Sequence, residues 1–205
     1  MIYEVRTYTL HPGTVAKWEE NFGKALPVRE KFSKLGAFWH TELGPLNQVI
    51  HVWPYEDLAD RNRVRAEAAG ATGWPPPSDG AIINMQSEIW VPAPFMRPMG
   101  GDQALGNIYE MRTYTCQPGS MNEVIKRGAE AVPHREEFSP LAAAMHCEVG
   151  GLNRWMHVWP YKDMEHRDSV RAAASESPHW PPPTREFFVS QETKFMVPAS
   201  FSPMH

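Results

Sequence analysis

The sequence is poor in three features that define large classes of proteins: cysteine, long apolar runs and an excess of positive charge. Only 2 cysteines occur among 205 residues, which excludes a disulfide framework and favours reduced thiols in a cytosolic protein. No apolar run approaches the roughly 20 residues that span a bilayer. The formal net charge is −4, so the chain has no general electrostatic attraction to nucleic acid or to an anionic membrane.

The short motifs of several enzyme classes are missing as well. Glycine-rich phosphate loops, zinc-type cysteine pairs and Ser-His-Asp orderings are all absent, which argues against kinases, nucleotide-binding proteins and serine hydrolases. We therefore expect no nucleotide cofactor and no dedicated metal site. Strand-like sequence begins at Ile2, so we expect no leader peptide. The expected location is cytoplasmic, with neither membrane nor nucleic acid as a partner.

What the chain does contain is a duplication. Residues 3–9 return as 109–115, and residues 40–55 return as 146–161, at one constant offset and with no gap. About 40 of the aligned positions are identical. The sequence thus predicts two domains, 1–99 and 107–205, joined by a linker at about 97–107.

Each copy shows the same order of predicted elements. Alternating β-branched and aromatic residues predict a strand over residues 2–9, and the spacing of Trp18, Phe22 and Leu26 predicts a helix over 15–32. A hairpin over 35–43 and 48–53, a helix over 56–69 and a strand over 85–91 complete a βαββαβ unit of ferredoxin-like order. The helices of such a unit leave one sheet face open. We predict an α+β fold in which tandem ferredoxin-like repeats pack sheet to sheet as a single-chain α+β barrel.

Several motifs resemble those of one known family. Tyr-Glu-x-Arg-Thr-Tyr, Gly-Pro-Leu-Asn, His-Val-Trp-Pro-Tyr and Trp-Pro-Pro-Pro look like the NIPSNAP family, and the resemblance covers both copies almost end to end. The second copy departs most clearly where Met145 replaces Trp39 and Ala144 replaces Phe38. The resemblance implies membership of the dimeric α+β barrel superfamily, which includes cofactor-free monooxygenases and haem-dependent enzymes. Folds of this kind host many reactions, so the resemblance implies the fold more strongly than the function.

A set of polar and aromatic side chains shares one face of the strands in both copies, because strand residues alternate between faces. These positions are retained between the copies while neighbouring positions differ. We predict that this face lines the barrel interior or its rims, and that the more apolar face carries the helices. The set is Glu4, Arg6, Tyr8, His40, Glu42, His51 and Trp53, repeated as Glu110, Arg112, Tyr114, His146, Glu148, His157 and Trp159.

One hypothesis makes the protein a cofactor-independent enzyme acting on a small metabolite such as a carbonyl compound or phenol, by isomerase, lyase or monooxygenase chemistry. Histidine titrates near neutrality, so His40 or His146 would be the general base and Glu42 or Glu148 would position it. The hydroxyl groups of Tyr8 and Tyr114 would act on a substrate oxygen. The residues expected to bind the substrate are Arg6, His51, Trp53, Arg112, His157 and Trp159.

Three alternatives stay open. The polar set can be a structural ionic network in a binding or scaffolding protein, which would then expose an apolar patch such as Trp90, Phe95, Met96 and Met99. His40, Glu42 and His51 supply the ligand types of a two-histidine, one-carboxylate metal site. Haem ligation by one histidine is the third alternative, although Trp and Phe side chains would crowd the haem.

The helices add further expectations. Arg61 and Arg65 are interpreted as solvated charges paired with Asp57 and Glu67, and Arg29 as a cation that favours the C-terminal end of its helix. The alternative function of Arg61 and Arg65 is to hold a carboxylate or phosphate near a pocket.

The apolar stripe of the first helix loses bulk in the second copy. Trp18, Phe22 and Leu26 become Val124, Gly128 and Val132, which predicts room for a ligand beneath the second copy's helix. Because the duplication already supplies the sheet pairing that separate subunits would otherwise make, the chain is expected to be a homodimer or a monomer.

Overall fold

The structure, a computed structural model, describes residues 1–205, and its elements follow the predicted order in both repeats. The first repeat consists of β1 (Ile2–Leu10), α1 (Val15–Arg29), β2 (Ala37–Leu43), β3 (Gln48–Tyr55), α2 (Leu58–Ala69) and β4 (Ile82–Pro92). The second consists of β5 (Ile108–Cys116), α3 (Met121–Glu136), β6 (Ala143–Val149), β7 (Arg154–Tyr161), α4 (Met164–Ser175), a short 3-10 helix (Arg185–Phe187) and β8 (Phe188–Pro198). The predicted bounds differ from these by a few residues.

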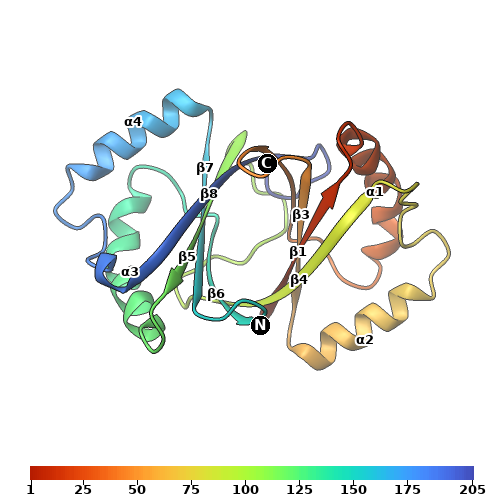
Figure 1. Ribbon diagram of the computed structural model, residues 1–205, viewed down its shortest axis with the longest axis horizontal. Coiled ribbons are helices and arrows are strands. Elements are labelled where there is room, and N and C mark those ends of the chain that lie inside the picture. Colours follow the sequence, from red (N-terminus) through yellow and green to blue (C-terminus); the bar gives the residue numbers. More distant parts are fainter.

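The strands close into a single barrel in the order β1-β3-β2-β8-β5-β7-β6-β4. Each repeat contributes one long strand that belongs to both halves. One edge of β4 pairs with β1 over residues 82–90, and its other edge pairs with β6 of the other repeat over residues 89–92. In the same way β8 pairs with β5 over 188–196 and, on its other edge, with β2 over 195–198. Figure 1 shows the consequence: the strands form the centre, with α1 and α2 on one side and α3 and α4 on the opposite side. The predicted single-chain barrel is confirmed.

The barrel interior is a continuous apolar cluster built from both repeats. Trp39 and Tyr109 meet there with ring centroids 5.3 Å apart, and Met145 and Met196 are fully enclosed. These side chains occupy the strand positions that alternate with the polar set. The interior is therefore a packed core rather than a binding chamber.

The polar set lies on the outer face of the barrel, beneath the helices, so the prediction that it lines the interior was wrong. A closed interior offers no water and few partners for charged groups, whereas the margins of a helix layer leave the outer face partly accessible. The predicted apolar patch is absent too, because Trp90 and Met99 are buried in the barrel interior and Phe95 and Met96 are half-buried.

Each helix layer is completed by a phenylalanine from the other repeat. Beyond β8, Phe201 stacks on Phe22 of α1, with ring centroids 5.7 Å apart and an interplanar angle of 14°. Beyond β4, Phe95 approaches Gly128 of α3 and Trp155 of β7. The two repeats thus exchange their C-terminal segments and are joined on the outside of the barrel as well as inside.

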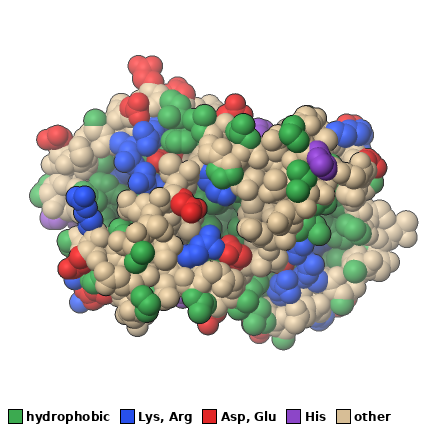
Figure 2. All heavy atoms as spheres, viewed as in Figure 1, with side chains coloured by type: hydrophobic (Ala, Val, Ile, Leu, Met, Phe, Trp, Pro, Cys, Tyr) green, Lys and Arg blue, Asp and Glu red, His purple; other side chains and the backbone are tan.

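The surface carries charged side chains of both signs interspersed over the face seen in Figure 2. None of the helices has the length and apolar character that crossing a membrane would require. Cys116 and Cys147 are both buried and unpaired, and burial raises the pKa of each thiol to about 11. Neither thiol is therefore suited to act as a nucleophile at neutral pH.

Candidate functional site

The centre of the first helix-covered site is a fully buried carboxylate, Glu4 of β1. Arg6 of the same strand and Arg61 of α2 lie 2.8 and 2.6 Å from its Oε1. Arg65, one turn further along α2, lies 3.5 Å from Oε2, and the Ser87 hydroxyl of β4 donates a hydrogen bond of 2.6 Å. Arg61 and Arg65 are four residues apart, so they lie on the same face of α2 and both reach Glu4.

These contacts keep Glu4 ionised although it is buried. Burial opposes the charged form, but the hydrogen bonds from Ser87 and Arg61 and the charges of Arg6 and Arg65 outweigh it. Together they lower the pKa of Glu4 to about 2. The carboxylate thus attaches α2 to the sheet at all ordinary pH values.

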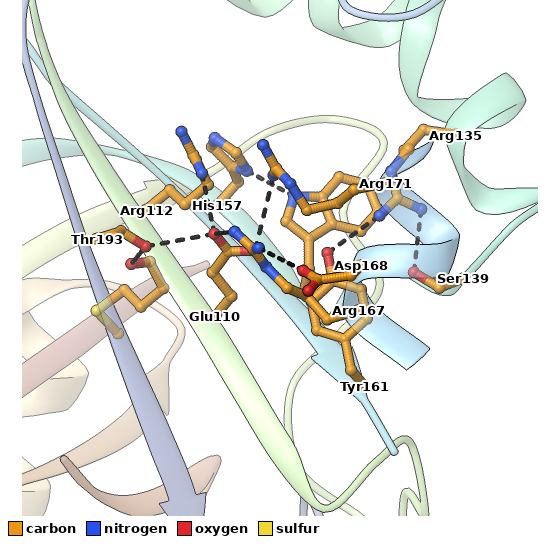
Figure 3. Close-up of polar contacts among 12 residues, drawn as sticks. Glu110, Arg112, Arg135, Ser139, His157, Tyr161, Arg167, Asp168, Arg171 and Thr193 are labelled. Carbon is orange, nitrogen blue, oxygen red and sulfur yellow. Dashed lines mark hydrogen bonds and ion pairs between the residues drawn. The ribbon is translucent and has the colours of Figure 1, made fainter. Parts of the chain in front are cut away.

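The second repeat reproduces this cluster around Glu110 (Figure 3). Its Oε1 lies 2.9 Å from Arg112 and 3.0 Å from Arg167, and its Oε2 lies 3.8 Å from Arg171. The Thr193 hydroxyl, in the place of Ser87, is 3.4 Å from Oε1. Because every partner is retained, the cluster is a paired feature of the fold.

A further arginine in each repeat is buried without a carboxylate. Arg29 at the end of α1 donates to the Tyr55 hydroxyl at 2.8 Å, and its guanidinium lies 4.3 Å from the Trp53 ring centroid. Arg135 at the corresponding place in α3 lies 4.4 Å from the Trp159 ring centroid. Burial lowers the pKa of both guanidinium groups, although arginine remains charged in proteins. Together, Glu4, its three arginine partners and Arg29 carry more positive than negative charge.

Beside each cluster a histidine is held in one tautomer by a tryptophan. The Trp53 indole nitrogen can only donate, and it lies 2.7 Å from His51 Nδ1, so Nδ1 accepts and the ring hydrogen is on Nε2. Trp159 and His157 repeat the arrangement at 2.6 Å. Burial and the nearby arginines, Arg6 for His51 and Arg112 for His157, lower both histidine pKa values to about 3. Both histidines are therefore neutral hydrogen-bond donors rather than general bases near pH 7.

The donor on His51 has no partner within the protein. Its Nε2 is fully buried and makes no hydrogen bond, and a buried unsatisfied donor costs about 1–3 kcal/mol. The Tyr8 ring packs edge-on against His51, and the Tyr8 hydroxyl accepts a hydrogen bond of 2.7 Å from Arg6 Nε. That hydroxyl donates to no protein atom, and Tyr8 and His51 line the same cavity.

Cavities open at these groups in both repeats. In the first, a cavity of about 380 Å³ lies between β1, β3, α2 and the loop that begins at Trp74. Its polar walls are Arg6, Tyr8, Arg29, His51 and Arg65, and Trp18 and Phe22 supply apolar walls.

In the second repeat the space has two neighbouring compartments, of about 270 and 300 Å³, which share Tyr114, His157, Trp159 and Trp180 as walls. The compartment of about 270 Å³ is lined by Arg112, Arg135 and Arg171. The compartment of about 300 Å³ extends under α3 past Val124 and Gly128, where the sequence predicted room for a ligand.

The predicted base and its positioner lie elsewhere. His40 Nδ1 is 2.8 Å from Glu19 of α1, a contact that raises the pKa of His40, and Glu42 is exposed at the end of β2. Burial lowers the pKa of His146, whose Nδ1 has no partner, and Glu148 is exposed. None of these four side chains lines a cavity of either helix layer. Arg6, Tyr8, His51 and Trp53, with their copies Arg112, Tyr114, His157 and Trp159, do meet there.

The proposed metal ligands His40, Glu42 and His51 do not come together, and no group of three His, Cys, Asp or Glu side chains is arranged to hold one ion. The favoured interpretation of the α2 arginines as solvated charges was also wrong. Arg61 and Arg65 pair with Glu4 rather than Asp57 and Glu67. The available signal was the retention of every one of these arginines in the second copy.

Solved structures with the same fold carry diverse descriptions. A monooxygenase-like protein from Lactobacillus acidophilus matches with a TM-score of 0.67 at 10% identity, covering 96% of this chain and 92% of that one. An anthrone oxidase-like protein matches with a TM-score of 0.60 at 8% identity, covering 100% of this chain and 94% of that one. Identities this low show a shared fold, that of the dimeric α+β barrels, and nothing about the reaction.

Sequence relatives are more specific. Human NipSnap homolog 3A is 30% identical over 219 residues, covering 100% of this chain and 86% of its own. Drosophila melanogaster NipSnap is 25% identical over 222 residues, covering 99% of this chain and 78% of its own. The NIPSNAP family profile matches twice, over residues 3–97 and 109–203. The chain therefore belongs to the NIPSNAP family and carries two tandem copies of its domain.

Proposed function

We propose that this protein binds a small molecule under the helix layer of each repeat and uses the paired histidine and tyrosine donors on an oxygen atom of that molecule. The single observation that carries the proposal is His51, a residue that lines the first cavity and whose buried Nε2 donor has no protein partner. A ligand oxygen would satisfy it and remove the cost of leaving it unpaired. The Tyr8 hydroxyl can donate to the same oxygen.

Two oriented donors that reach one oxygen would support a definite kind of chemistry. They stabilise negative charge that develops on a carbonyl or phenolic oxygen, as in enolisation or in cofactor-independent oxygenation. The protein contributes donors that are already oriented, since Trp53 fixes the ring of His51 and Arg6 fixes the hydroxyl of Tyr8. The catalytic base assigned from the sequence, His40 or His146, stays a prediction.

Binding is tested with a panel of small carbonyl and phenolic compounds, followed by thermal unfolding and calorimetric titration. We expect ligands that stabilise the protein and that lose at least about tenfold in affinity when His51 and His157 are both replaced by Phe, which cannot donate a hydrogen bond. The matched control is His11→Phe at an exposed position. Binding that the double variant leaves unchanged would sink the proposal.

Turnover is tested on the same compounds. Oxygen uptake and exchange of substrate hydrogen with deuterium separate oxygenation from enolisation. The role of the predicted base is decided by His40→Ala and His146→Ala: if either abolishes turnover while binding persists, the sequence-based assignment is right, and if neither does, the base lies elsewhere.

A further inference from the structure

The arginines beside the second cavity outnumber their acidic partners. Arg112, Arg135 and Arg171 line its polar compartment. The acidic group within ion-pair distance of them is Glu110, which contacts Arg112 and Arg171 and is also shared with Arg167. Arg135, only 2% exposed, has no acidic partner and donates instead to Ser139 and Tyr161.

Such an imbalance is costly unless a counter-charge is supplied. A buried cation without a counter-charge loses its hydration and gains no compensating attraction. A network whose only purpose was to attach α4 to the sheet would need no more guanidinium groups than the carboxylate can pair. An anion that arrived with a ligand would balance this surplus, and arginine forks match a planar carboxylate well.

The second observation is the apolar compartment that adjoins these arginines. Val124, Gly128 and Ala144 stand where the first repeat has Trp18, Phe22 and Phe38. The space they leave is bounded by Leu141, Trp155 and Phe188. The two compartments share the walls His157, Trp159 and Trp180 and therefore adjoin one another.

From these two observations we infer that the second repeat binds an amphipathic monocarboxylic acid. Its carboxylate lies among Arg112, Arg135 and Arg171, and its chain or ring extends under α3 past Val124 and Ala144. The inference rests on the proposed binding function and adds the chemical class of its ligand. The first repeat has arginines in the same places, but Trp18, Phe22 and Phe38 fill the corresponding apolar space. Its cavity of about 380 Å³ lacks the second compartment, so we expect a strong octanoate site in the second repeat only.

The test uses octanoate, octanamide and octanol, which share one chain and differ in charge, with octyl phosphate as a second anion. Isothermal titration calorimetry of the full chain is expected to show one octanoate site whose affinity exceeds that of the amide and the alcohol by at least about tenfold, or about 1.4 kcal/mol. Acetate, which has no chain to bury, is expected to bind at least about tenfold more weakly than octanoate.

Two variants locate the ligand. Arg171→Met removes a partly exposed guanidinium and is expected to weaken octanoate, but not octanol, by at least about tenfold. Val124→Trp introduces the residue of the first repeat and is expected to abolish octanoate binding while acetate still binds. Lys126→Met on α3 makes the same charge change as Arg171→Met at an exposed position that lines no cavity, and it should leave octanoate affinity unchanged. Thermal unfolding confirms that each variant is folded.

The outcomes separate this inference from the proposed function. Equal binding of octanoate and octanamide overturns the carboxylate assignment and leaves small-molecule binding intact. Tighter binding of octyl phosphate than of octanoate overturns the choice of a monocarboxylate. Full octanoate affinity in Val124→Trp overturns the placement under α3. If no compound binds here and the carbonyl and phenolic panel also fails, both the inference and the proposed function are wrong.

Discussion

Replacing Glu4 by glutamine tests the central feature of the site, the buried carboxylate. The substitution keeps the size of the side chain and removes its charge, so that Arg6, Arg61 and Arg65 lose their common acidic partner. The pKa of Glu4 falls from 4.5 to about 2 on folding. Since one pKa unit corresponds to about 1.4 kcal/mol, ionisation of Glu4 contributes about 3 kcal/mol to the free energy of unfolding at neutral pH. This agrees with the ~3–5 kcal/mol that follows from breaking one side of a buried ion pair.

The pH dependence of the stability difference between the parent protein and Glu4→Gln is a second test of the same prediction. A carboxylate with a lowered pKa stabilises the protein above the unfolded-state pKa, and the contribution disappears as the pH falls through the folded-state pKa. For Glu4 the window lies between pH 4.5 and about 2. Equilibrium urea unfolding should therefore show a constant difference between the parent protein and Glu4→Gln at pH 6 to 8, and a smaller difference at pH 3.

Glu42→Gln is the matched control, because Glu42 is exposed at the end of β2 and forms no ion pair. A surface change of this kind is expected to alter the free energy of unfolding by no more than about 0.5 kcal/mol. The reasoning is refuted if Glu4→Gln costs less than about 1 kcal/mol at pH 7, or if its cost is the same at pH 3 as at pH 7, since ionisation of Glu4 would then contribute little.

Three further predictions concern the histidine, the barrel and the exchanged segments. Burial and Arg6 lower the pKa of His51 from 6.5 to about 3. The free energy of unfolding is therefore fully retained above pH 6.5 and declines as the pH falls towards 3, because the unfolded chain takes up the proton first. Urea unfolding of His51→Phe should show a shallower decline of this free energy over the same range. Met145→Ala in the barrel interior should lower the free energy of unfolding by about 2–5 kcal/mol at any pH, because the side chain is enclosed and leaves a cavity; a loss under about 1 kcal/mol would mean that the interior is not packed. Phe201→Ala should lower the melting temperature more than Phe95→Ala in matched thermal scans, because Phe201 packs on two rings at 5.7 and 5.0 Å and Phe95 meets one at 6.4 Å.

Much of the fold could be predicted from the sequence because its signals are local. Alternation, helical spacing and the duplication each depend on residues close in the chain or on direct comparison of two copies. The same alternation separated the polar set of each strand from its apolar set, but it could not decide which set faces the barrel. Both faces of these strands are buried, one by Trp39 and Met145 of opposite repeats and one by helices. The decisive rule is that the fully enclosed side must be the more apolar one.

The site was less predictable because its key contacts are distant in sequence. The local pattern on α2 offers Arg61 and Arg65 acidic neighbours one turn away, and an exposed helix would use them. Their actual partner, Glu4, is more than 50 residues away and reaches them only after β1 has joined the sheet. Spacing also suggested a helix-terminus role for Arg29, whereas its guanidinium lies over the Trp53 ring. Retention of all these arginines between copies was the stronger signal, since exposed ion pairs contribute little and are readily lost.

The two sites share a barrel but are chemically separate. Every group that contacts Glu4 comes from the first repeat, and every group that contacts Glu110 comes from the second. A charge introduced at one cluster therefore has no direct partner in the other. Substitutions at one site can accumulate without breaking the ion pairs of the other site. The covering phenylalanines do cross over, with Phe201 on α1 and Phe95 beside α3. A single repeat could thus supply the charged groups of a site but not its cover. The fusion of two copies keeps both sites covered while the second gains its apolar compartment through changes confined to its own helix and strands.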